Sequence, residues 1–133
     1  MNLLVNVDVD DVERAEEFYL RALGLRAGRR FGAEMRELLG ADAPIYLLRK
    51  EAGTLPCAGS PARRDYARHW TPVHLDFVVE DLDAALKRAI DAGARLEGAV
   101  VTRKWGRMAN LADPWGHGIC LLQFSARGYD ELL

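Results

Sequence analysis

The sequence lacks the features that would point to nucleic acid, to a membrane or to an export route. Its 18 basic and 20 acidic residues nearly cancel, for a formal charge of −2, so no global field favours a polyanionic partner. No apolar run approaches the roughly 18 residues that span a bilayer, and no basic leader precedes the acidic residues that begin at Asp8. We therefore expect a soluble, untargeted protein with no nucleic-acid or membrane partner.

Cysteine is scarce as well. Cys57 lies in a stretch rich in glycine and proline, and Cys120 lies in an apolar run. Two cysteines so placed form neither a disulfide framework nor a zinc motif, which indicates a reducing cytoplasm. A chain of 133 residues can bury a core without disulfides or a structural metal, so we predict one domain over residues 1–133.

The sequence contains an internal repeat, with one copy at residues 4–26 and the second, 70 residues later, near 73–96. In each copy apolar residues first alternate and then recur at helical spacing. An aspartate that can cap a helix separates the two patterns, either Asp10 or Asp11 in the first copy and Asp81 in the second. Gly24 and Gly93 supply the helix stops. Each copy is therefore predicted to begin with a strand followed by a helix.

Three short strands are predicted after each helix, bounded by glycine and proline. Their approximate ranges are 25–31, 33–39, 45–49, 94–101, 107–112 and 119–124, with a frayed helical turn at the C-terminus. We predict an α+β fold in which two tandem βαβββ modules form one curved, mostly antiparallel, eight-stranded sheet cup. Module one covers about residues 1–50 and module two about 71–125. Residues 51–70 form a connection that is either a solvated linker or a functional lid.

The alternation also assigns a polar face to each opening strand. Because the apolar face must pack under its helix, the polar face points into the cup. It carries Leu4, Asn6 and Asp8 in module one and His74 and Asp76 in module two. Asp8 and Asp76, 68 residues apart, are placed at matched positions and interpreted as rim charges or hydrogen-bond acceptors rather than as a catalytic pair.

Three runs of residues carry a resemblance to a known family. They are V-x-V-x-V-x-D-V-x-x-A-x-x-F-Y at the start of the chain, H-L-D-F-V-V-E-D-L-D-A-A from residue 74, and W-G-x-x-x-x-L-A-D-P-W-G-H-x-I-x-L-L from residue 105. Together they resemble the vicinal oxygen chelate superfamily, which includes glyoxalase I, extradiol dioxygenases, and fosfomycin- and bleomycin-resistance proteins. The resemblance specifies the fold well and the activity poorly. It also implies a homodimer.

Enzymes of this superfamily hold a divalent metal with side chains from the first and last strands of each module. The corresponding positions here are Leu4, Tyr46, His74 and Cys120. Leu4 cannot donate, Tyr46 would have to ionise a phenol whose ordinary pKa is about 10, and an apolar strand raises the pKa of a cysteine. His74 and Cys120, with Asp76 or Asn6 as an unorthodox third ligand, form the alternative to the prediction that no metal and no other cofactor is bound.

The motif residues have competing interpretations. Arg103 and Trp105 either grip a flat or anionic ligand or belong to a solvated hairpin whose tryptophan caps the core. Trp70 is a core plug, a dimer contact or a pocket wall. Asp113 and Gly116 are interpreted as turn residues of D-P-W-G-H-G.

The favoured function is a metal-free protein of the bleomycin-resistance type that sequesters an aromatic or cationic small molecule. Its predicted ligand-binding residues are Asn6, Asp8, Tyr46, Leu48, His74, Asp76, Arg103, Trp105, Cys120 and Leu122. The alternative is a glyoxalase-like lyase, isomerase or dioxygenase that uses an irregular metal site or His74 as general base. A third possibility is a regulatory or interaction subunit whose cup is filled by its own side chains.

Overall fold

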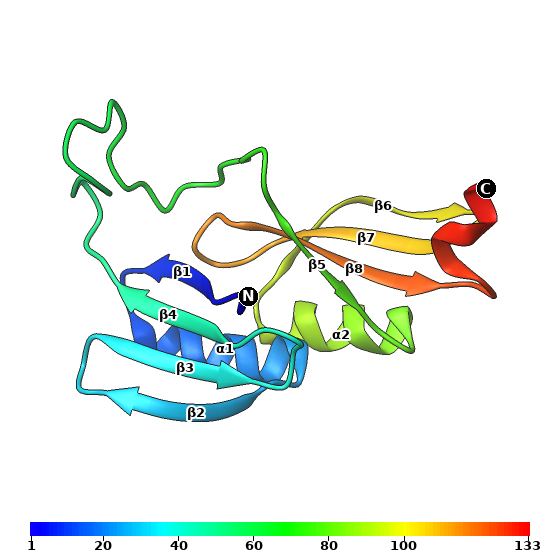
Figure 1. The fold of residues 1–133 in the computed structure, drawn as a ribbon, viewed down its shortest axis with the longest axis horizontal. Helices are drawn as coiled ribbons and strands as arrows, with labels where there is room; N and C mark the ends of the chain where they lie inside the picture. The colour runs from blue at the N-terminus through cyan, green and yellow to red at the C-terminus, as the bar shows by residue number, and fades with distance from the viewer. The chain divides into compact units, whose positions relative to one another are not determined.

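The order of strands and helices is the same in both halves of the chain (Figure 1), in a computed structural model that describes all residues from 1 to 133. Module one consists of β1 (Val5–Val9), α1 (Val12–Leu23), β2 (Arg26–Phe31), β3 (Met35–Leu39) and β4 (Ile45–Arg49). Module two consists of β5 (Leu75–Val78), α2 (Leu82–Ala92), β6 (Arg95–Arg103), β7 (Gly106–Ala112) and β8 (Gly118–Phe124). A short 3-10 helix, η1 (Gly128–Leu132), ends the chain. The predicted pair of βαβββ modules is confirmed.

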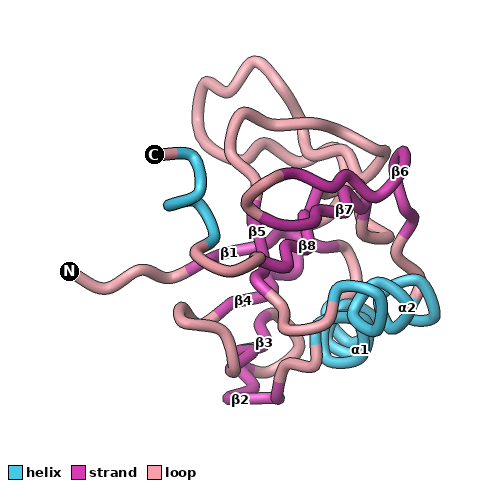
Figure 2. Tube along the Cα trace, turned by 90° about the vertical axis from the view of Figure 1, so that its right-hand side faces the viewer, coloured by secondary structure: helices cyan, strands magenta, loops and turns pink.

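Hydrogen bonds group the eight strands into two four-stranded sheets, with the orders β1-β4-β3-β2 and β5-β8-β7-β6. The first and last strands of each module pair in parallel, and the other pairs are antiparallel. The α+β class and the mostly antiparallel pairing are therefore confirmed. The long connection between β4 and β5 contains no helix or strand (Figure 2).

The chain divides into two compact units, Met1–Tyr66 and Ala67–Leu133, and the boundary falls inside the predicted linker. Arg64 Nε donates to Asp8 Oδ2 at 2.7 Å, which ties the first part of the connection to module one. Arg68 donates to both carboxylate oxygens of Glu97, at 2.6 and 2.7 Å, and ties the last part to module two. Residues 51–70 are therefore held at both ends rather than being a free solvated linker.

Capping aspartates and glycines set the ends of both helices. Asp11 Oδ1 accepts the amide protons of Glu13 and Arg14 at 3.1 and 3.0 Å, so Asp11 rather than Asp10 is the N-cap of α1. Asp81 caps α2 in the same way. Gly24, with φ 67°, ends α1 in the left-handed region. No helix is both long and apolar enough to cross a membrane.

Each helix buries its apolar stripe against one face of its own sheet. The buried residues of module one include Val9, Val12, Ala15, Phe18, Tyr19, Ala22, Leu38, Ile45 and Leu47, and those of module two include Leu82, Ala85, Ala89, Leu111, Trp115, Ile119 and Leu121. Each fully buried leucine stabilises the fold by roughly 2 kcal/mol relative to exposure. Because side chains alternate along a strand, the residues between these core positions project from the opposite face of each sheet, here called the open face because no helix of the same module covers it, although Tyr46, Cys120 and Leu122 are buried there.

We predict that Asp11→Ala lowers the free energy of unfolding by about 1 kcal/mol, because two amide protons of the first turn of α1 lose their acceptor. Urea unfolding followed by circular dichroism measures the change. The matched control is Asp42→Ala, which removes an equal charge from an exposed position and should shift stability by no more than about 0.5 kcal/mol. Equal losses in the two variants would show that charge, not capping, is responsible.

Candidate functional site

A row of polar side chains crosses the open face of the module-two sheet. The strand register aligns Asp76 on β5 with Cys120 on β8, Cys120 with Asn110 on β7, and Asn110 with Glu97 on β6. We call these four residues the module-two polar row. Cys120 Sγ donates to Asn110 Oδ1 at 3.0 Å, so neighbouring members of the row bond to each other.

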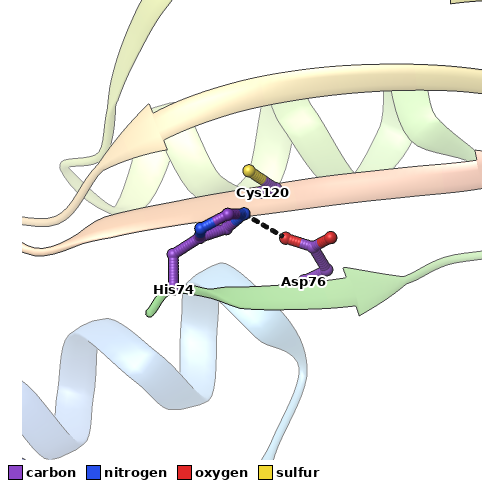
Figure 3. Close-up of side chains that lie close together, drawn as sticks. All are labelled: His74, Asp76 and Cys120. Carbon is purple, nitrogen blue, oxygen red and sulfur yellow. Dashed lines mark ion pairs between the residues drawn. The ribbon is translucent and has the colours of Figure 1, made fainter. Parts of the chain in front are cut away.

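His74 precedes β5 and turns back onto this row (Figure 3). Its Nε2 lies 3.1 Å from Asp76 Oδ1, and both side chains are about one-third exposed. Nε2 is therefore the ring nitrogen that faces the carboxylate, and Nδ1 is the ring nitrogen that Asp76 does not contact. His74 and Asp76 form a dyad whose free acceptor is Nδ1.

Cys120 is a protonated thiol in this site. The residue is 2% exposed, and burial, followed by the charge of Asp76 and a hydrogen bond with it, raises the pKa of the thiol to about 12. A thiol with this pKa is not a nucleophile near neutral pH, and it would have to release its proton to bind a metal. The sequence-based interpretation of Cys120 as a buried residue with a raised pKa agrees with this environment.

Trp70 stands beside the dyad. The centroid of its ring is 5.0 Å from that of His74, with an interplanar angle of 33°, and the residue is 58% exposed. A Cβ on Gly118 would lie 2.7 Å from the Trp70 ring, so the glycine lets the indole approach β8 closely. The Arg68 guanidinium lies 5.4 Å from the ring centroid. Of the three earlier interpretations of Trp70, this exposed position beside His74 argues against a core plug.

The residues present do not fit the metal centre that the family resemblance implies. His74, Asp76 and Cys120 offer three donor atoms within 4.8 Å of one another, a set that zinc could use in principle. In this arrangement, however, Nε2 of His74 is paired with Asp76, and the Cys120 thiol carries a proton that it donates to Asn110. Binding a metal here would require His74 to leave Asp76 and the Cys120 thiol to release its proton. That no metal is bound therefore stays a prediction, and the donor chemistry supports it.

Module one carries a corresponding row with different chemistry. Asn6 on β1 aligns with Tyr46 on β4, and Tyr46 aligns with Glu37 on β3. The Tyr46 hydroxyl donates to Glu37 Oε1 at 2.8 Å, and Arg29 binds both oxygens of the same carboxylate at 2.9 and 2.6 Å. Hydrogen bonds from the Arg29 side chain, its amide and Tyr46 lower the pKa of Glu37 to about 2. Tyr46 is thus a neutral hydrogen-bond donor and not an ionised ligand.

The predicted ligand-binding residues fall into separate groups. The strand register places Asn6, Asp8, Tyr46 and Leu48 together on the open face of module one, and His74, Asp76, Cys120 and Leu122 together in module two. The register also corrects one prediction. The counterpart of Asp76 is Asn6, and the counterpart of Asp8 is Val78, because each pairs with the equivalent position of the last strand. Asp8 and Asp76 therefore do not occupy matched positions.

Arg103 and Trp105 are not brought to the dyad. They flank the β6–β7 turn, where Gly106 pairs with Arg103 and with Phe124. Phe124 is four residues beyond Cys120, or about 13 Å along β8. Trp105 instead contacts Phe124 and Tyr129, with centroid distances of 6.3 and 5.2 Å. This placement favours a tryptophan that caps the hairpin over one that grips a ligand beside His74.

Several site residues escape prediction from the sequence. Asn110 is the polar exception in the apolar stretch 108–112 of β7, which was an available signal, whereas Glu37 follows Arg36 in β3 and does not stand out. Arg68 and Arg29 had no such signal, because they come from segments with several arginines. Asp113 accepts the amide protons of Trp115 and His117 at 2.8 Å, which agrees with its predicted role in the turn.

The fold, two successive βαβββ modules, identifies the class of protein. A family model described as a glyoxalase-like domain matches residues 4–122, and the chain belongs to this family of the vicinal oxygen chelate superfamily. The fosfomycin resistance protein FosX from Listeria monocytogenes shares the fold, with a TM-score of 0.73 at 15% identity over 100% of this chain and 98% of that one.

Two further proteins are similar in sequence. The anthracycline biosynthesis protein DauV from Streptomyces sp. (strain C5) is 31% identical over 124 residues, which are 90% of this chain and 40% of that protein. The chain thus spans less than half the length of this relative. TnmS3, an antibiotic binding protein from Streptomyces sp. CB03234, is 25% identical, with a TM-score of 0.64 over 94% of this chain and 96% of that one.

Cys120 should resist alkylation at neutral pH, because it is buried and its pKa is raised to about 12. Peptide mass spectrometry after treatment with iodoacetamide should find the label on the exposed Cys57 alone. Unfolding in guanidinium before labelling should expose both thiols. Rapid labelling of Cys120 in the folded protein would contradict its assignment as a neutral, enclosed thiol.

The pKa of Glu37 gives a prediction for acid stability. Its folded value of about 2 lies below the ordinary 4.5, so its contribution is present above pH 4.5 and is lost as the pH falls toward 2. We expect Glu37→Gln to be less stable at neutral pH and to show a smaller loss of unfolding free energy on acidification. Glu51→Gln, at an exposed position, should keep the wild-type slope. Parallel pH profiles for the two variants would refute the assignment.

Proposed function

We propose that this protein binds a flat small molecule beside the His74–Asp76 dyad, without a metal ion in that site. The observation that carries the proposal is the exposed indole of Trp70, held 5.0 Å from a histidine whose Nε2 is already engaged by Asp76. An exposed aromatic ring offers a stacking surface. Nδ1 of His74 and the second oxygen of Asp76 offer acceptors for an amine or hydroxyl of the ligand.

The chemistry of the site favours a ligand that is aromatic and that donates hydrogen bonds. All acceptors named above belong to neutral or anionic groups, whereas the nearby guanidinium of Arg68 is held by Glu97. A protonated amine beside the Asp76 carboxylate would gain a charge-assisted hydrogen bond. Similarity to an antibiotic binding protein and to an anthracycline biosynthesis protein supports polycyclic antibiotics as the first compounds to test.

A second candidate function rests on the dyad itself. Asp76 orients the His74 ring and leaves Nδ1 as the base, which is the arrangement of a general base fixed by a carboxylate. Such a protein would convert the ligand instead of storing it. Mass spectrometry of the ligand recovered after long incubation separates the two: an unchanged ligand supports sequestration, and a product that requires His74 supports catalysis.

The binding experiment is a thermal-shift screen of planar antibiotics and aromatic metabolites, followed by calorimetry on each hit. At 100 times its dissociation constant a ligand stabilises the fold by about 2.7 kcal/mol, which such a screen detects. Trp70→Ala and His74→Ala should each weaken binding by about 2- to 12-fold, the equivalent of about 0.5–1.5 kcal/mol for a stacking contact or a hydrogen bond. Chelator should leave the affinity unchanged.

The matched control is Trp105→Ala, which removes an indole from the opposite end of the module-two sheet and should preserve affinity. An affinity that disappears with chelator and with Cys120→Ser would overturn the metal-free proposal. A screen in which no compound shifts the melting temperature would favour a regulatory or interaction subunit. We also propose, from family resemblance alone, that the protein is a homodimer, which sedimentation equilibrium tests.

A further inference from the structure

Two histidines outside the proposed ligand site contact each other in the second compact unit of the chain. His69 belongs to the segment before β5, and His117 belongs to the turn between β7 and β8. Their ring centroids are 5.1 Å apart with an interplanar angle of 87°. Both residues are partly exposed. The third histidine of the chain, His74, belongs to the dyad described above.

The partners of the two rings fix the same tautomer in both. Nδ1 of His69 lies 3.0 Å from the carbonyl oxygen of Ala67, and Nδ1 of His117 lies 2.8 Å from Asp113 Oδ2. Carbonyl and carboxylate oxygens only accept, so each Nδ1 carries a proton. The neutral rings therefore both present an Nε2 lone pair, and neither Nε2 has a hydrogen-bond partner.

This pattern is the one that proteins use to prepare histidines for metals. A metal-binding histidine almost always donates its other ring N–H to a carboxylate or a backbone carbonyl, which orients the ring and raises its basicity. The ring spacing also suits an ion. A metal about 2.0 Å from each Nε2 lies about 3 Å from each ring centroid, so two rings at a tetrahedral angle have centroids about 5 Å apart.

We propose that His69 and His117 bind a divalent transition-metal ion of the kind that imidazole favours, such as Zn²⁺, Cu²⁺ or Ni²⁺. The two Nε2 atoms supply the protein ligands, and water completes the coordination. With only two protein ligands the ion exchanges readily. This site is distinct from the His74–Asp76 dyad, and the ligand-binding proposal does not depend on it.

The backbone holds both histidines in place before an ion arrives. Asp113 Oδ1 accepts the amide proton of His117, and the His69 amide donates to the Gly116 carbonyl at 3.1 Å. At Gly116, with φ +82°, a Cβ would lie 2.1 Å from the Ala67 carbonyl oxygen, so the two segments can touch only because this residue is glycine. A bound ion would add a cross-link between residues 67–69 and the 113–117 turn.

The positive charge of Arg68 repels a bound ion less than a free guanidinium would, because Arg68 is paired with Glu97. Arg68 lies between Ala67 and His69, but its guanidinium donates to both oxygens of Glu97, and Asp113 contributes a second negative charge beside His117. The charges of Arg68 and Glu97 compensate each other, and the Asp113 carboxylate lies 2.8 Å from Nδ1 of His117.

Zinc binding to the whole chain tests the proposal. The protein carries Cys57→Ser to remove its exposed thiol, and Zn²⁺ is added to chelator-treated protein in calorimetry. We expect one equivalent to bind, with affinity reduced at least tenfold in both His69→Gln and His117→Gln and within twofold of the parent in His74→Gln. In long-range ¹H–¹⁵N spectra of the parent, zinc should shift Nε2 of His69 and His117 and leave the resonances of His74 unchanged.

Each outcome bears on the proposal. The spectra need no histidine variant, so they decide the matter even if His117→Gln, which loses its bond to Asp113, unfolds. Zinc that shifts His74 and is lost in His74→Gln would place the ion at the dyad and overturn this inference. Absence of binding at millimolar zinc would overturn it as well.

Discussion

The parallel pairing of the first and last strands decides which residues of this protein can act together. In both modules the last strand returns to lie beside the first, so residues about 40 positions apart become neighbours: Asn6 with Tyr46, and Asp76 with Cys120. The helix between them covers one face of the sheet, and the other face is left for polar side chains. The position of Cys120 beside the dyad depends on this register, since a shift of one residue would turn Asp76 into the core.

Because the two modules share this geometry, the side chains at equivalent positions can be compared directly. In module one the row ends in a buried carboxylate that Tyr46 and Arg29 satisfy completely. That arrangement fixes the strands to one another and leaves little for a ligand. In module two the equivalent of Glu37 is the neutral Asn110, and the carboxylates lie instead at the two ends of the row, on Asp76 and Glu97. The duplicated frame thus holds a closed network in one copy and an open one in the other.

Elements whose signals are local were predictable from the sequence. Alternation, capping aspartates and stop glycines located β1, α1, β5 and α2 to within a few residues, because each signal acts over one strand or one helical turn. The choice of Asp11 over Asp10 was not predictable, since both can cap and only backbone geometry selects between them. The prediction that Asp8 and Asp76 occupy matched positions was wrong for a related reason. The pairing register depends on the partner strand, so it cannot be deduced from the opening strands alone.

Prediction from the sequence is limited in the same way for single atoms of the site. His74 was recognisable from its polar face, but which of its nitrogens remains open depends on Asp76, two residues away and on the same face. His69 and His117 are each unremarkable in the sequence, and their shared tautomer follows from a carbonyl in one segment and a carboxylate in another. A histidine with Nε2 engaged offers Nδ1, close to its own backbone, to a small ligand or a proton. A histidine with Nδ1 engaged projects Nε2 outward, where a second ring can share the same ion. The partners of Nδ1 and Nε2, and not the number of histidines, therefore separate the two sites of module two.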